Sequence, residues 1–218
     1  MGCCQYQVLE TTFDRSVAEA ELRTYRVKGM NKTTHLLVDA LKSQGVQGKT
    51  LLDIGGGIGI IQHELLQAGL RHSINVEASM AYIEATKEEA TRQGHTDRIS
   101  YHHGDFVDIA STLSPTDIVT LDKVICCYDD WQTLVERSAA LARTFFGIVI
   151  PRTNLTSKLS IGWENFILWL RRHPFRTFIH PVKAIDTLLK NTGFTQLVHQ
   201  KTFIWHMKLY ARNTSHDK

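Results

Sequence analysis

The stretch LLDIGGGIGIIQHELL, residues 51–66, joins an apolar run to a helical segment through a cluster of glycines. The run ends at Asp53, and Gly55, Gly56, Gly57 and Gly59 follow it. Glycine lets the backbone turn sharply and approach a ligand closely, and the N-terminus of the next helix offers unpaired N–H groups. The stretch therefore predicts a strand, a ligand-binding turn and a helix, with a plain tight turn as the simpler alternative.

The spacing of these glycines argues against a dinucleotide site. The dinucleotide pattern G-x-G-x-x-G, started at Gly55, places Ile60 at its third glycine position. The registers that start at the two following glycines fail as well. A nicotinamide-dependent oxidoreductase is therefore disfavoured, although the glycine turn keeps it as an alternative.

Short β-rich runs alternate with helical segments from residue 50 onward. Five runs are expected to be strands, at 50–54, 73–77, 99–103, 117–121 and 145–150. Helices are expected at 14–27, 31–43, 60–68, 80–93, 130–145, 160–173 and 181–194. Two final runs, at 195–203 and 204–212, are close enough to form an antiparallel pair. Parallel strands joined by crossover helices explain this alternation, which predicts an α/β sheet covered on both faces.

Two further acids stand where predicted strands end. Glu77 ends the run 73–77, and Asp105 follows the run 99–103 with Phe106 beside it. A carboxylate can accept hydrogen bonds from both hydroxyls of a ribose, and ligands of open α/β sheets bind at the carboxyl ends of the strands. Each acid alone would also fit a solvated loop, but three acids at the ends of three consecutive strands favour a ligand site.

The pattern acid-x-G-x-G-x-G at 53–59 resembles the first motif of the class I S-adenosylmethionine-dependent methyltransferases. The resemblance extends from about residue 48 to residue 212 and implies S-adenosylmethionine as the cofactor. The binding residues that it implies, from the methionine part through the ribose to the adenine, are Asp53, Gly55, Gly57, Gly59, Glu77, Asp105 and Phe106.

Three later segments resemble the magnesium-protoporphyrin IX O-methyltransferase branch and its uncharacterised bacterial relatives. They are DKVICCYDD at 122–130, IPR at 150–152 and PFRTFIHPVKAIDTLLKNTGF at 174–194. In these relatives a substrate lid lies between the fifth strand and the next helix, which corresponds to residues 153–180 here.

We therefore predict an α/β fold with a Rossmann-like, seven-stranded, mostly parallel sheet, N-terminal helices and a helical lid insertion. One structural domain is expected. Its parts are a helical cap at 1–45, a methyltransferase domain at 46–212 with the lid at 153–180, and a tail at 213–218.

The loop after the fourth predicted strand is expected to lie beside the transferred methyl group. Asp122, Tyr128 and His180 are our candidates for substrate contact or proton handling, and Asp122 also for cofactor contact. Each has a simpler alternative: Asp122 could cap the next helix, Tyr128 could pack against it, and His180 could bind a backbone group. Tyr25 could close over the methionine end of the cofactor, as N-terminal aromatics do in similar enzymes, or pack between helices.

The four cysteines occur as two adjacent pairs, Cys3 with Cys4 and Cys126 with Cys127. A zinc site built from both pairs would need the N-terminal segment to fold back over the fourth strand, and adjacent cysteines are poorly spaced for zinc. Redox catalysis is disfavoured because the cysteines lack the C-x-x-C arrangement. We therefore expect no metal, and expect Cys126 and Cys127 to be small apolar liners of the core and the pocket.

The lid segment and the basic end of the chain suggest the kind of partner. Residues 151–218 carry 11 Lys and Arg against 3 Asp and Glu, whereas residues 1–150 carry 14 against 19. Trp163, Phe166, Ile167 and Leu170 form an apolar stripe at helical spacing. Three arginines follow it: Arg171, Arg172 and Arg176. This pattern would suit a flat apolar substrate with carboxylates or shallow contact with a membrane surface, or a helix packed on the core.

We expect a small-molecule substrate and no nucleic acid. The fourth-strand motif reads DKVI and lacks the Asn/Asp-Pro-Pro-Tyr/Phe pattern of many amino-directed nucleic-acid methyltransferases. A nucleic-acid or protein methyltransferase and a non-catalytic scaffold are the alternatives. No apolar run approaches the roughly 20 residues that span a bilayer, and the start of the chain lacks a secretory pattern, which predicts a cytoplasmic protein. The sequence does not assign the oligomeric state.

Overall fold

The glycine stretch folds as predicted, with β1 (Thr50–Ile54) leading through residues 55–59 into α4 (Ile60–Gln67). The computed structural model describes residues 3–213, with side chains described from residue 8 onward. β1 is apolar on both sides because it lies inside the sheet: Leu51 packs into the core on one face and Leu52 and Ile54 into the core on the other.

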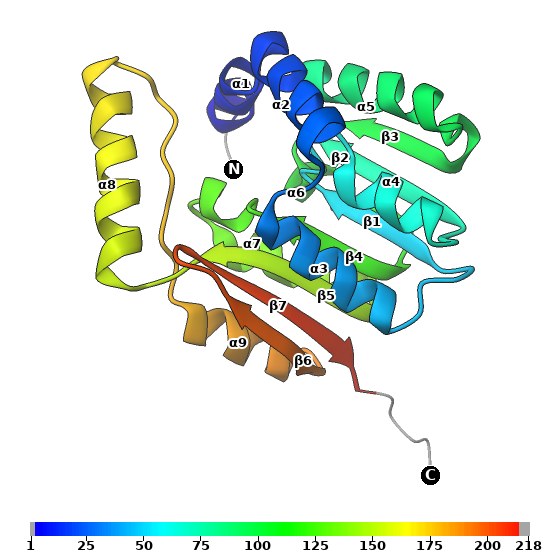
Figure 1. Cartoon of the computed structure of the whole chain (residues 1–218). Helices are drawn as coiled ribbons and strands as arrows, with labels where there is room; N and C mark the ends of the chain where they lie inside the picture. The colour runs from blue at the N-terminus through cyan, green and yellow to red at the C-terminus, as the bar shows by residue number, and fades with distance from the viewer. Residues whose placement is uncertain (1–2, 214–218) are drawn as a thin grey trace.

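The predicted seven-stranded, mostly parallel sheet is confirmed, with the strand order β3-β2-β1-β4-β5-β7-β6 (Figure 1). The strands after β1 are β2 (His72–Glu77), β3 (Ile99–His103), β4 (Thr116–Asp122), β5 (Ala142–Pro151), β6 (Phe194–Lys201) and β7 (Trp205–Arg212). β7 pairs antiparallel with both β5 and β6, and the remaining neighbours are parallel. The carboxyl ends of β1, β2 and β4 therefore meet at one edge.

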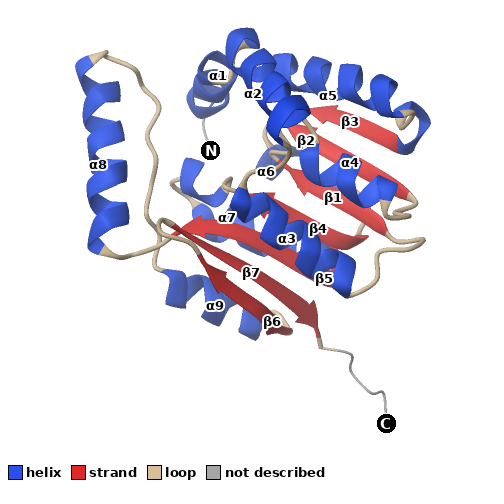
Figure 2. Cartoon of the chain, viewed as in Figure 1, coloured by secondary structure: helices blue, strands red, loops and turns tan. Residues whose placement is uncertain are grey.

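Helices cover both faces of the sheet, as Figure 2 shows. The α-helices of the described residues are α1 (Cys3–Thr12), α2 (Arg15–Lys28), α3 (Lys32–Ser43), α4, α5 (Met80–Gln93), α6 (Phe106–Ile109), α7 (Trp131–Leu141), α8 (Leu155–Leu170) and α9 (Val182–Asn191), of which α8 lies away from the sheet (Figure 1). Apolar residues of α3 and α4 fill one core, whereas residues of α6, α7 and α9 fill the core on the opposite face. A third cluster joins α2 to α5 above the glycine turn.

Two predicted helices differ from the structure in their bounds, and one observed helix was not predicted. The helix expected at 130–145 ends at Leu141, because Phe145 and Phe146 are buried as part of β5. The lid helix, expected at 160–173, begins earlier, where the Asn154 side chain accepts a hydrogen bond from Ser157 N and caps it. α1 was not predicted at all, and no helix was expected before residue 14.

None of the helices among residues 3–213 is long and apolar enough to cross a bilayer. The helical lid does form, as α8 followed by an extended strap at residues 171–180. The strap is tied to α8 because Asn165 donates to Thr177 O at 2.8 Å and accepts from Thr177 N at 2.9 Å.

The last helix is fixed to the sheet by an ion pair between a buried lysine and a half-buried aspartate, which offers a test of the fold. Lys208 on β7 is buried, and its Nζ lies 2.6 Å and 2.7 Å from the two Asp186 carboxylate oxygens on α9. Tyr210 also donates to this carboxylate, at 2.6 Å.

We expect Asp186→Ala to lower the free energy of unfolding by about 3 kcal/mol, because it leaves the Lys208 ammonium buried without its counter-ion. Urea unfolding followed by circular dichroism measures this, with the exposed Asp97→Ala as the matched control. The double variant Asp186→Leu, Lys208→Met should recover most of the loss; an unchanged midpoint for Asp186→Ala would contradict the assignment.

Candidate active site

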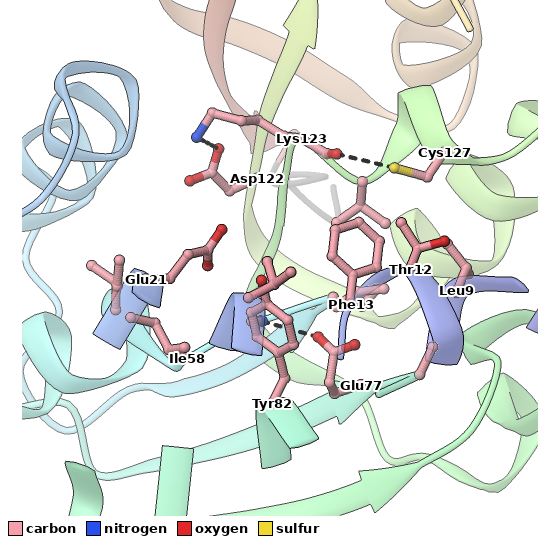
Figure 3. Close-up of a pocket in the computed structure, with 18 of the residues that line it drawn as sticks. Leu9, Thr12, Phe13, Glu21, Ile58, Glu77, Tyr82, Asp122, Lys123 and Cys127 are labelled. Atoms are coloured by element: carbon pink, nitrogen blue, oxygen red, sulfur yellow. Dashed lines mark hydrogen bonds and ion pairs between the residues drawn. The ribbon is translucent and has the colours of Figure 1, made fainter. Parts of the chain in front are cut away.

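A cavity of about 790 Å³ opens at the edge where β1, β2 and β4 end (Figure 3). Its walls come from the glycine turn, the ends of β2 and β3, the loop after β4, helices α1 and α2, and the lid. Segments that are far apart in the sequence therefore surround one space.

The glycine turn has a left-handed backbone at three positions and little room for side chains at Gly55 and Gly59. Gly55, Gly57 and Gly59 have φ values of +60°, +55° and +77°, a left-handed backbone that other residues adopt at a cost. A Cβ at Gly55 would lie 2.5 Å from Val124 Cγ2, and one at Gly59 would lie 2.6 Å from Thr86 Cγ2. The turn is therefore constrained both by its own conformation and by the elements packed against it.

Gly56, which the spacing argument left out, is constrained as well. A Cβ there would lie 2.5 Å from Gln62 Nε2 and 2.8 Å from Asp53 Oδ2. Asp53 is buried at the end of β1, where Thr120 Oγ1 donates to it at 2.6 Å and Gln62 Nε2 at 3.0 Å. Burial raises the pKa of Asp53 to about 7, against the effect of these two donors, and the nearby Asp122 carboxylate adds to the rise.

Glu77 lies at the end of β2 with its carboxylate held by backbone groups. Gly57 N donates to Oε2 and Ser79 N donates to Oε1, each at 3.0 Å. Burial raises the pKa of Glu77, and the two backbone bonds act in the opposite direction. Each carboxylate oxygen has further lone pairs, so the fixed group can still accept hydrogen bonds from a ligand in the cavity.

The end of β3 contributes Gly104 and Phe106 to the cavity wall, but the wall within the described chain does not include Asp105. The Asp105 side chain caps α6 by accepting from Val107 N at 2.9 Å, and it also accepts from the Tyr128 hydroxyl at 2.9 Å. Asp105 therefore lies behind the wall, with its Oδ1 bound to two neighbouring protein groups.

Asp122 ends β4 and Lys123 follows it, and both residues line the cavity. The Thr34 hydroxyl donates to Asp122 Oδ2, and Lys123 Nζ lies 3.1 Å from Asp122 Oδ1. Lys123 has a φ of +64°, which is uncommon for a residue with a side chain and typical of constrained positions at functional sites. Its ammonium also lies 3.4 Å from Asn31 Oδ1 and 5.8 Å from the centre of the Trp205 ring.

Of the other two catalytic candidates, Tyr128 lines the cavity and His180 does not, within the described chain. His180 Nε2 lies 2.8 Å from Tyr128 O, so its ring binds a backbone group, as in the simpler alternative. Burial lowers the pKa of His180 and raises that of Tyr128 well above its usual range. Neither group presents a proton acceptor to the cavity.

Cys126 and Cys127 both line the cavity as thiols. Their sulfur atoms lie 3.3 Å and 3.6 Å from Lys123 O, a geometry in which each thiol donates. The Cys126 side chain and burial both raise the pKa of Cys127 well above its usual range, so it stays protonated. The side chains of Cys3 and Cys4 lie outside the described ones, and the described residues contain no cluster of three or more metal-ligating groups.

The N-terminal helices supply site residues that were not predicted. Glu21 on α2 faces the space between Asp122 and Glu77 (Figure 3), and burial raises its pKa. Glu21 lies on the same helix face as the buried Ala18, three residues earlier, and the buried Tyr25, four residues later. This helical spacing in the sequence could have predicted that Glu21 faces inward.

Tyr25, a predicted residue, lines the cavity, but its hydroxyl donates to Glu64 at 3.2 Å. Burial raises the pKa of Tyr25 to about 12. Its ring packs into the cluster between α2 and α5, as the helix-packing alternative expected.

The remaining wall is apolar and comes from α1 and the lid. Leu9, Thr12 and Phe13 line it from the N-terminal side, and Glu164, Leu168, Phe175 and Thr177 line it from the lid. Phe13 lies between α5 and the lid, because its ring lies 5.8 Å from the ring of Tyr82 and 5.8 Å from that of Phe175. Glu164 is the acid on this side, and burial raises its pKa.

Residues 52–144 match the model of a methyltransferase domain family. Among curated proteins, the chain is 31% identical over 74 residues to the ribosomal protein L11 methyltransferase of Photorhabdus laumondii, a match that covers 34% of this chain. The corresponding protein of Tolumonas auensis is 34% identical over 74 residues. The chain spans about a quarter of the length of these relatives, since each match covers 25% of the relative.

Solved structures resemble the chain over most of its length. The magnesium protoporphyrin IX methyltransferase of Synechocystis PCC 6803, solved with bound S-adenosylhomocysteine, has a TM-score of 0.73 at 17% identity and covers 95% of this chain and 99% of its own. The same protein has been solved with S-adenosylmethionine. An O-methyltransferase family protein of Burkholderia thailandensis has a TM-score of 0.72 at 16% identity, covering 94% of this chain and 63% of its own.

At these identities the structural matches establish the fold, and the family match covers the segment that holds Asp53, the glycine turn and Glu77. The fold, the domain match and the arrangement of the cavity agree with the resemblance found in the sequence. Residues 52–144 therefore match a methyltransferase domain, and the fold resembles that of the class I S-adenosylmethionine-dependent methyltransferases, including the magnesium-protoporphyrin IX methyltransferase branch.

Proposed function

We propose that this protein transfers the methyl group of S-adenosylmethionine to an oxygen, a hydroxyl or a carboxylate, of an apolar small molecule. One observation carries the proposal: the cavity is a single space with two chemically different halves. Glycines and acids form the half at the ends of β1 and β2, whereas apolar side chains of α1 and the lid form the other.

The first half suits the cofactor because its charges are complementary. S-adenosylmethionine carries a sulfonium and an ammonium group, and Asp53, Glu77 and Asp122 surround the space beside the glycine turn. We place the methionine part against the turn, the ribose on Glu77, and the adenine against Gly104 and Phe106. A bound cation would also lower the cost of gathering these buried acids.

The second half suits an apolar acceptor with a polar reacting group. Methyl transfer from a sulfonium displaces a neutral leaving group, so the protein's main tasks are to position the two reactants and to exclude water. Lys123 could bind an anionic acceptor oxygen. Glu164, whose pKa is raised, could accept the proton of a hydroxyl acceptor.

This assignment gives the predicted parts of the chain distinct roles. We propose that the cap at 1–45 closes the cavity, since α1 and α2 line it, and that 153–180 acts as the substrate lid of the domain at 46–212. Of the predicted residues, we assign Asp53, Gly55, Gly57, Glu77, Phe106 and Asp122 to the cofactor. Gly59, Asp105 and His180 support the site from outside the cavity wall.

A protein or nucleic-acid substrate is the second candidate. The curated relatives are named for a ribosomal protein, and the last third of this chain is strongly basic. Incubation with labelled S-adenosylmethionine and fractionated cell extract separates the two candidates. Label in the extractable small-molecule fraction supports our proposal, and label retained in protein or RNA overturns it.

We expect Glu77→Ala to weaken binding of S-adenosylmethionine about 10- to 100-fold, because a lost charged hydrogen-bond partner costs about 1.5–3 kcal/mol. Titration calorimetry with S-adenosylmethionine and S-adenosylhomocysteine measures this. The exposed Glu136→Ala on α7 is the matched control and should bind like the unaltered protein. Binding that is absent from the unaltered protein at millimolar cofactor would rule out the proposed function.

Affinity for S-adenosylmethionine should rise by about tenfold between pH 6 and pH 8. The reason is that the pKa of Asp53 is about 7, and the ionised carboxylate attracts the cationic cofactor more strongly than the neutral carboxyl does. The sign follows from Asp53: burial raises its pKa, so the carboxyl is mostly neutral below pH 7 and charged above it. The facing acids Glu21 and Glu77, whose pKa values are also raised, act in the same direction.

Titration calorimetry at several pH values tests this, with Asp53→Asn as the comparison. The variant should bind more weakly at pH 8 and show a flatter pH profile. An equally steep profile in Asp53→Asn would show that another group controls the dependence.

A further inference from the structure

The lid helix α8 turns its apolar side away from the protein. Six large apolar side chains are between 48% and 70% exposed: Leu155, Leu159, Trp163, Phe166, Trp169 and Leu170. At 100° per residue they fall on one side of the helix, and we call this set the outer stripe. The opposite side holds Ser157 and Ile161, which are buried, and Glu164 and Leu168, which line the cavity.

Nothing in the described part of the chain packs over the outer stripe. Its aromatic rings contact one another, with 5.8 Å between the centroids of Trp163 and Phe166 and 6.0 Å between those of Phe166 and Trp169. Figure 1 shows α8 at the edge of the molecule, beside the strap and away from the sheet. A contiguous apolar surface of this kind marks an interaction site.

Cations flank the outer stripe. Lys158 lies on α8, and Arg171 and Arg172 follow its last turn; all three are exposed, and none forms an ion pair with a described residue. The acid of α8, Glu164, faces the cavity instead. The stripe therefore combines Trp, Phe and Leu with unneutralised positive charge.

A second exposed ring lies close to the start of this helix. Phe203, 73% exposed, occupies the turn between β6 and β7. The turn is joined to the base of α8, because Ser157 Oγ donates to Ile204 O at 3.1 Å and Arg152 N donates to Ile204 O at 2.7 Å. An exposed aromatic side chain therefore also lies on the element that is joined to the start of α8.

We propose that the outer stripe docks this protein on the surface of an anionic lipid bilayer, with α8 lying in the plane of the interface. Trp, Phe and Leu side chains enter the boundary between head groups and acyl chains, and Lys and Arg bind the anionic head groups. This surface is separate from the cofactor site and does not depend on the reaction that we propose.

The charges favour a bilayer over a second copy of the chain. Pairing two outer stripes would place the cations at the ends of one helix against those of the other, and like charges brought together in this way repel. An anionic bilayer instead neutralises them. Because the opposite side of α8 lines the cavity, docking also brings the apolar half of the cavity next to the membrane, where an apolar acceptor would concentrate.

Vesicle flotation tests the proposal on the full chain. We expect binding to phosphatidylcholine vesicles that contain about 30% phosphatidylglycerol, and at least about tenfold weaker binding to pure phosphatidylcholine. The double variant Trp163→Ser, Trp169→Ser should partition at least about tenfold more weakly onto the anionic vesicles. Arg171→Gln with Arg172→Gln should lower binding and reduce its dependence on salt.

The control is Val27→Ser with Leu197→Ser, which removes two exposed apolar side chains from α2 and β6 and should leave vesicle binding unchanged. Urea midpoints and affinity for S-adenosylmethionine show whether each variant is folded. No vesicle binding by the unaltered protein, or equal binding by the folded tryptophan variant, would overturn the proposal. The proposal would also be overturned if the unaltered protein did not bind vesicles but formed a dimer in light scattering, and the tryptophan variant was a monomer.

Discussion

The hydrogen bond from Gly57 N to the Glu77 carboxylate joins the turn after β1 to the end of β2, and the site is built around it. The bond is possible because the two strands run parallel in a register that pairs Ile54 with Val76, so that Gly55 N also donates to Val76 O at 2.8 Å. A side chain at Gly55 would collide with Val124 from the loop after β4. The glycines therefore let three strand ends approach one another, with β4 on the far side of β1 from β2, where open α/β sheets bind their ligands.

This close approach collects negative charge. Asp53, Glu77, Asp122 and Glu21 lie around one space, and burial raises the pKa of Asp53, Glu77 and Glu21. Lys123 lies within this group, in a left-handed conformation that directs its ammonium towards Asp122. The negative charge of this cluster can be balanced by a cationic ligand and by Lys123. Four acids from the first 150 residues thus lie around one cavity.

The sequence was sufficient to predict what local pattern controls. The alternation of runs predicted the sheet, and it predicted that Asp53, the glycine turn and Glu77 lie at neighbouring strand ends, because strand ends in parallel sheets have a fixed geometry. Contacts between distant segments were not predictable in this way. Asp105 accepts a hydrogen bond from Tyr128, which lies 23 residues later in the chain. Lys123 has a left-handed backbone conformation, which is uncommon for lysine and was not predicted from the sequence. α8 was predicted as an amphipathic helix, but periodicity alone does not say which side faces the protein.

The lid and the cofactor half of the cavity are connected through the loop after β4. Phe178 N in the strap donates to Cys126 O at 2.7 Å, and His180 binds Tyr128 O at 2.8 Å. The Tyr128 hydroxyl then holds Asp105, which caps α6 beside Phe106. The groups in these bonds are buried or half-buried. Moving the strap would therefore break hydrogen bonds of Cys126 and Tyr128, which line the cavity together with Phe106. Through these bonds His180 and Tyr128 connect the lid to the part of the cavity wall that holds Phe106.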